Sequence, residues 1–134
     1  MSNMKSIRLV LFFSKDVSLK DWDVIGMFDR EVEIYKRLCY LGVSISFITY
    51  GDSDDLAYQS RIKGINILCN KWNIKNVIYQ KYLYLIHWKY LINCDVIKTN
   101  QANGSEIALT AAKFWKKPLL GRMGYLLSDF VAKK

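Results

Sequence analysis

The residues whose types could bind a ligand lie in three short segments that are polar or contain glycine. They are Gly26, Arg30 and Glu31 in the first segment, Asn100, Gln101 and Gly104 in the second, and Arg122 and Gly124 in the third. The arginine of the third segment could hold a phosphate or carboxylate through two parallel hydrogen bonds. The backbone N–H groups of a helix opened by Gly26 could face an anion. These residue types favour binding of an anionic ligand, and the alternative for Arg122 is an ordinary surface ion pair.

Familiar catalytic and metal-binding patterns do not accompany these residues. The chain has no glycine-rich dinucleotide or phosphate loop and no serine in the α/β-hydrolase nucleophile pattern. His87, the only histidine, falls inside an expected helix, which favours a packed or surface residue over a catalyst. Cys39, Cys69 and Cys94 lie in apolar runs without zinc-ligand spacing, as in a reduced, cytosolic protein. The sequence therefore predicts a binding crevice with no identified catalytic residue, no metal and no cofactor.

Composition indicates one compact domain with a basic surface. The chain has 134 residues, 51% of them hydrophobic, and a single proline, so it can bury one substantial core. Its net charge of +8 suits an anionic partner (a phosphate, a membrane surface or nucleic acid) and equally suits simple solubility. No clustered basic helix or stacking motif supports nucleic acid, which we do not expect as a partner. The apolar run 7–13 is too short to span a membrane and reads as a strand.

Strand and helix patterns of hydrophobic residues alternate along the chain. A long polar loop, 14–23, follows the first apolar run, and a weak short helix is expected at 56–63. Asn103 and Glu106 have the spacing of a capping box before the helix at 107–115. Strands are expected at 7–13, 43–49, 65–69, 96–99 and 119–122, and helices at 26–41, 74–93, 107–115 and 126–132.

This alternation predicts an α/β fold: a Rossmann-like three-layer sandwich with a mostly parallel sheet and helices on both faces. Right-handed crossovers make 3-2-1-4-5 the expected strand order, in which the first and fourth strands are neighbours and the winding direction reverses between them. The loops 14–25, 100–105 and 122–125 would then meet at one edge of the sheet and form a crevice. The alternative is a well-formed strand–helix corner that binds no ligand.

The expected helix 74–93 is apolar or aromatic on most sides and is interrupted by Lys75, Lys81 and Lys89. It carries too much charge for a transmembrane helix. A helix this apolar needs cover on more than one face. The parent sheet, another domain or a membrane interface could supply that cover, and residues 71–93 are a candidate for peripheral membrane contact.

Two groups of motifs carry a family resemblance. The first is Gly26-Met27-Phe28-Asp29-Arg30-Glu31, which leads into a helix ending at Leu41-Gly42 and then a strand. The second is Asp95-Val96-Ile97, followed by Ala111-Ala112-Lys113 and then Lys117-Pro118-Leu119-Leu120. In order and spacing the chain resembles, over nearly its whole length, the N-terminal domain of GT-B glycosyltransferases of family four.

That resemblance implies retaining transfer of a sugar from a nucleotide-sugar donor to an envelope, polysaccharide or lipid-linked acceptor. The expected location is the cytoplasm, at the inner face of the membrane. Residues 1–134 would form a single domain that shapes the acceptor side of the cleft. The donor-binding C-terminal domain is missing from this sequence, so we expect little or no transfer by the chain alone.

Two further points qualify the resemblance. Asn100 and Gln101 stand where many relatives place a histidine-containing segment, so the role of that histidine does not carry over. The competing hypothesis is a non-catalytic α/β module that binds a phosphorylated ligand or a partner chain.

Overall fold

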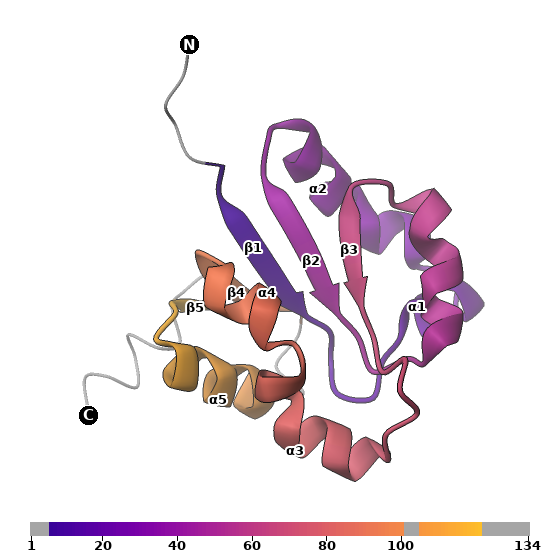
Figure 1. Ribbon diagram of the computed structural model, residues 1–134. Helices are drawn as coiled ribbons and strands as arrows, with labels where there is room; N and C mark the ends of the chain where they lie inside the picture. Colours follow the sequence, from indigo (N-terminus) through magenta and orange to yellow (C-terminus); the bar gives the residue numbers. More distant parts are fainter. Residues whose placement is uncertain (1–5, 101–104, 122–134) are drawn as a thin grey trace.

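The computed structural model describes residues 6–100 and 105–121, which form a sheet with helices on both faces (Figure 1). The strands are β1 (Arg8–Phe12), β2 (Ser44–Ile48), β3 (Ile65–Leu68), β4 (Val96–Thr99) and β5 (Leu119–Leu120). The helices are α1 (Leu19–Val24), α2 (Phe28–Tyr40), α3 (Asn76–Ile86), α4 (Trp88–Asn93), α5 (Ser105–Trp115) and the 3₁₀ helix η1 (Ser53–Arg61).

The five strands are all parallel and follow the order β3-β2-β1-β4-β5, which confirms the predicted topology. The first strand lies at the centre, where Leu9 pairs with Ile45 of β2 on one side and with Val96 of β4 on the other. The winding direction therefore reverses between β1 and β4. In parallel α/β sheets the carboxyl ends of the strands at such a reversal form the usual binding crevice.

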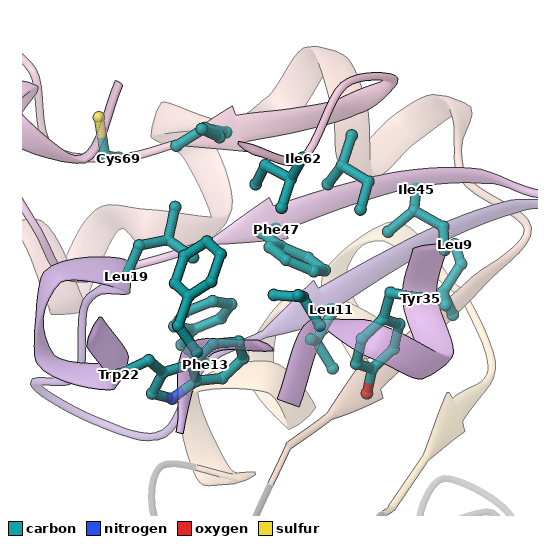
Figure 2. Packing of buried hydrophobic residues seen from close by; sticks show 14 residues of the cluster. Leu9, Leu11, Phe13, Leu19, Trp22, Tyr35, Ile45, Phe47, Ile62 and Cys69 are labelled. Carbon is teal, nitrogen blue, oxygen red and sulfur yellow. The ribbon is translucent and has the colours of Figure 1, made fainter. Parts of the chain in front are cut away.

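One hydrophobic core lies between the sheet and the layer of α1, α2 and η1 (Figure 2). Aromatic rings fill its centre: Phe13 stacks on Trp22 with ring centroids 4.2 Å apart, and both rings pack against Phe47. An apolar stripe of α2 faces this core, and its members Phe28, Val32 and Tyr35 are buried. The stripe is buried because its members recur every three or four residues and so share one side of the helix.

A second core lies on the opposite face of the sheet, beneath α3, α4 and α5. Tyr79 and Leu83 of α3 are completely buried there. Small side chains on α5 allow that helix to approach the sheet and α3 closely. They are Ala108, Ala111 and Ala112.

The polar stretch 14–23, expected to be a loop, contains all of α1 but its last residue. Ser18 and Asp21 form a capping box: the Ser18 hydroxyl accepts from the Asp21 N–H at 3.1 Å, and the Asp21 carboxylate accepts from the Ser18 N–H at 2.9 Å. Leu19 and Trp22 provide the buried side of this short helix. The prediction failed because the segment is mostly polar, although the capping-box spacing was present in the sequence.

The expected helix 74–93 is broken at His87 into α3 and α4. His87 has φ −102° and ψ 32°, outside the regular helical range. The break redirects the chain, so that Leu91 of α4 is buried in the same core as Tyr79 of α3. In Figure 1, α3 lies beyond the arrowheads of the strands and α4 runs back over the sheet.

Candidate functional site

The candidate site lies at the carboxyl ends of β1 and β4. The backbone N–H of Asn100, just after β4, donates to the carbonyl of Phe12 at the end of β1 with a length of 3.1 Å. The helix α2 runs antiparallel to the strands, because it connects two parallel neighbours. Its first turn therefore lies at the same edge of the sheet as Asn100.

Four polar side chains from α2, β4 and the position just after β4 make up this site, and we call them the α2–β4 cluster. They are Glu31, Tyr35, Lys98 and Asn100.

A hydrogen bond joins the two elements of the cluster. The Lys98 ammonium donates to the Tyr35 hydroxyl at 3.1 Å. Glu31 precedes Tyr35 by one helical turn, and Asn100 follows Lys98 by two strand residues, so each lies on the same side of its element as its partner. Glu31 and Asn100 are both nearer than their partners to the carboxyl edge of the sheet.

The cluster is well shielded for a group of polar residues. Tyr35 and Asn100 are buried, Lys98 is half-buried and the Glu31 side chain is 11% exposed. Arg30 lies outside it, with its guanidinium 3.8 Å from the Glu31 carboxylate and 78% of its side chain exposed. An ammonium group can bind a phosphate, whereas a carboxylate and an amide can bind sugar hydroxyls. The arrangement suits a polar, anionic ligand.

Gly26 has a structural role between α1 and α2, and it does not open a helix as expected. It takes a φ of +77°, its N–H donates to Asp23 O at 3.1 Å, and the N–H of Met27 donates to Trp22 O at 2.9 Å. This is a Schellman motif, which ends α1, and glycine is favoured because positive φ strains other residues. The helix α2 then begins two residues later, at Phe28. Contact of Gly26 with a ligand stays a prediction.

The other predicted site residues, and the proposed capping residue Asn103, lie outside the described residues. The site residues concerned are Gln101, Gly104, Arg122 and Gly124. Lys98 and Tyr35 were missed because each sits in an apolar segment that reads as core. The available signal was a lysine inside an otherwise apolar strand.

A second polar cluster, centred on Asp55 of η1, connects Thr49 at the carboxyl end of β2 with the first turn of α1. The Asp55 carboxylate is 1% exposed and accepts hydrogen bonds from the Thr49 hydroxyl at 2.7 Å and from the N–H groups of Leu19 and Lys20 at 3.1 and 3.3 Å. Burial raises the pKa of Asp55, and these hydrogen bonds oppose that rise. The carboxylate thus links η1 to the first turn of α1 through hydrogen bonds.

The Asp55 cluster borders an open pocket of about 260 Å³ that is rich in aspartates, including Asp16, Asp52 and Asp54. Among the described residues, no set of three or more possible ligands is arranged to hold a metal ion. We interpret the Asp55 cluster as a structural device that orders the edge of the crevice.

His87 is packed, as the sequence suggested. Its Nε2 lies 2.8 Å from the hydroxyl of Tyr79, and that hydroxyl donates to the carbonyl of Thr49 at 2.8 Å. The hydroxyl has one proton, so His87 is the donor to it, which assigns the ring proton to Nε2. Burial, and then the charge of Lys71, lower the pKa of His87 to about 4, so the imidazole is neutral at pH 7.

Comparison with known protein families, curated proteins and solved structures finds no match to this chain. The fold defines its class: a Rossmann-like α/β protein with a five-stranded, all-parallel sheet and helices on both faces. None of the helices in residues 6–100 and 105–121 combines the length and apolarity needed to cross a membrane.

Proposed function

We propose that the protein is the acceptor-side, N-terminal domain of a GT-B glycosyltransferase. The reaction would transfer a sugar from a nucleotide-sugar donor to an envelope, polysaccharide or lipid-linked acceptor, in the cytoplasm at the inner face of the membrane. The observation that carries the proposal is the hydrogen bond from the half-buried Lys98 ammonium to the Tyr35 hydroxyl, on the two elements whose ends carry Glu31 and Asn100 at the switch point of the sheet. The motif resemblance around Gly26 and Glu31 supports the same assignment.

In this proposal the cluster positions a substrate and does not itself react. The Lys98 ammonium would neutralise a phosphate of the donor or of a lipid-linked acceptor, while Glu31 and Asn100 would bind sugar hydroxyls. Holding two substrates in a reactive geometry supplies much of the rate enhancement of a group transfer. We assign no catalytic residue and no metal.

The second candidate is a non-catalytic module that binds a phosphorylated ligand or a partner chain. The Lys98–Tyr35 pair is compatible with it, since an ammonium and a phenol can bind an anion without any catalytic group nearby. The two candidates differ in whether bound nucleotide sugar is consumed.

Binding and turnover can be measured separately. Isothermal titration calorimetry with nucleotide sugars, nucleoside diphosphates and sugar phosphates would measure affinity for wild type, Lys98→Met and the surface control Lys36→Met. We expect Lys98→Met to weaken binding about tenfold or more, the value of one charge-assisted hydrogen bond, and the control to bind as wild type. Equal affinity in all three proteins would refute the assigned site.

Radiolabelled nucleotide sugars incubated with the protein and a membrane extract would measure transfer. Labelled lipid or polysaccharide would support the glycosyltransferase. Tight binding of sugar phosphates with intact donor after long incubation would support the binding module.

A further inference from the structure

The segment 71–94 combines large exposed apolar side chains with positive charge. It carries four lysines and no aspartate or glutamate. We call one part of its surface the basic aromatic face. Its apolar members are Trp72, Ile78, Tyr82, Leu85 and Trp88, and its charged members are Lys71, Lys75 and Lys89.

Three apolar members form a stripe along α3. Ile78, Tyr82 and Leu85 are spaced by four and three residues, so they share one side of the helix, and each is 41–46% exposed. The side that bears Tyr79 and Leu83 is buried in the second core. A third side contacts α5, where the Trp115 indole N–H donates to the Tyr84 carbonyl at 2.8 Å. The stripe is thus the side of α3 that the described chain leaves open.

The two tryptophans lie where α3 meets α4. Trp72 is 49% exposed and Trp88 is 53% exposed. Together with Lys71 and Lys89 they line a pocket of about 300 Å³ beside β3. The Lys71 ammonium lies 5.3 Å from the centre of the Trp72 ring. Exposed indole rings thus sit among positive charges at this junction.

Acidic groups near this segment are directed away from the stripe. Asp16 accepts hydrogen bonds from Asn76 and Gln80, which lie on the side of α3 opposite to Tyr82. Glu106 lines a different pocket, between α3 and α5, together with Lys81. The basic aromatic face therefore keeps a positive character of its own.

We propose that the basic aromatic face docks the protein on an anionic lipid bilayer. Tryptophan and tyrosine rings favour the depth of lipid headgroups, aliphatic side chains favour the acyl boundary, and lysines bind anionic headgroups. All three kinds of side chain occur here on one helix and its junction with the next. The proposal rests on these surface residues and not on the α2–β4 cluster, so lipid binding and nucleotide-sugar binding can fail independently.

Vesicle co-sedimentation tests the proposal directly. The purified protein would be mixed with phosphatidylcholine vesicles or with vesicles that also contain phosphatidylglycerol, at low and high salt. The test variant is Lys71→Glu/Lys89→Glu. The matched control is Lys36→Glu/Lys63→Glu, which makes the same change in net charge at exposed positions outside the face.

We expect the wild type to prefer anionic vesicles and to lose that preference at high salt. The test variant should bind anionic vesicles about 25-fold more weakly, about fivefold for each lysine taken from the surface, and the control should bind within about twofold of wild type. Equal binding to both vesicle types, no binding to either, or equal losses in the two variants would overturn the proposal.

Quenching of tryptophan fluorescence by brominated lipids tests the orientation. Wild-type fluorescence should be quenched on anionic vesicles, and most of the quenching should disappear in Trp72→Phe/Trp88→Phe. Undiminished quenching in that variant would place another surface against the bilayer and overturn the proposed face. A stable dimer whose dissociation requires these tryptophan changes would assign the face to a second copy of the chain and likewise overturn lipid docking.

Discussion

Replacing Gly51 by alanine tests whether the Asp55 cluster orders the edge of the crevice. A Cβ atom added at Gly51 would lie 2.5 Å from Cγ and Oδ2 of the Asp55 carboxyl group, far closer than van der Waals contact. A carboxylate at the end of a free side chain would rotate away at little cost. This one is held by Thr49 and by the first N–H groups of α1, so moving it breaks those hydrogen bonds.

The cost follows from the bonds that are lost. Each buried hydrogen bond to a charged group contributes about 1.5 kcal/mol, so Asp55→Ala, which removes the bonds from Thr49, Leu19 and Lys20, should cost about 4.5 kcal/mol. Gly51→Ala should displace the carboxylate only partly and cost about 2–3 kcal/mol. In the double variant the added Cβ no longer meets a carboxylate, so the total should stay at about 4.5 kcal/mol, which corresponds to a coupling of about 2–3 kcal/mol between the two sites.

Urea unfolding followed by circular dichroism measures these values. With a slope of about 1.5 kcal/mol per molar urea, Gly51→Ala should lower the midpoint by about 1–2 M. Asp54→Ala is the matched control, an exposed aspartate of the same pocket, and should change stability by less than about 0.5 kcal/mol. Additive losses in the Gly51→Ala/Asp55→Ala variant would refute the steric reasoning.

Three further predictions concern His87, the cap of α1 and the cysteines. The pKa of His87 is about 4 in the folded protein and about 6.5 in the unfolded chain, so the native state binds fewer protons between these values. About 3 kcal/mol of stability that is present above pH 6.5 should therefore be lost as the pH falls toward 4. In His87→Gln the urea midpoint should change much less with pH across that range. A pH dependence equal to that of the wild type would contradict the assignment. Ser18→Ala should cost about 1 kcal/mol in the same assay, since it removes the side-chain cap of α1, whereas no loss would show that Asp55 alone holds that helix end. Burial raises the pKa of Cys69 and Cys94 to about 11, so only the half-buried Cys39 should react readily with a thiol reagent at pH 8. All three cysteines should react in denaturant. Fast labelling of Cys94 in the native protein would contradict the packing.

Much of the fold could be read from the sequence because its signals are local. Apolar runs alternate with helical stripes, and the handedness of crossovers restricts the ways in which such units can assemble. The stripe of α2 and the Glu33–Arg37 ion pair, 2.9 Å long, both follow from helical spacing alone. The order of the strands was predicted correctly for the same reason.

Two wrong predictions concern segments whose structure depends on contacts distant in the sequence. The helix α1 lies in a polar stretch, and its stability depends on Asp55, a residue far along the chain. The break at His87 lies inside a continuous apolar segment, and the His87 ring there bonds to Tyr79, whose hydroxyl bonds to Thr49 just after β2. Neither partner can be identified from sequence spacing.

For the candidate site, the sequence placed Glu31 and Asn100 at one edge of the sheet, because parallel strands bring their carboxyl ends together. Only the tertiary structure joined Tyr35 to Lys98, since α2 and β4, which lie some sixty residues apart in the sequence, meet through packing against the sheet. Periodicity therefore determined which elements form and which side of each is apolar. The contacts between those sides, which depend on side-chain shape and on hydrogen bonds distant in sequence, decided which polar groups share the crevice and which apolar groups stay exposed.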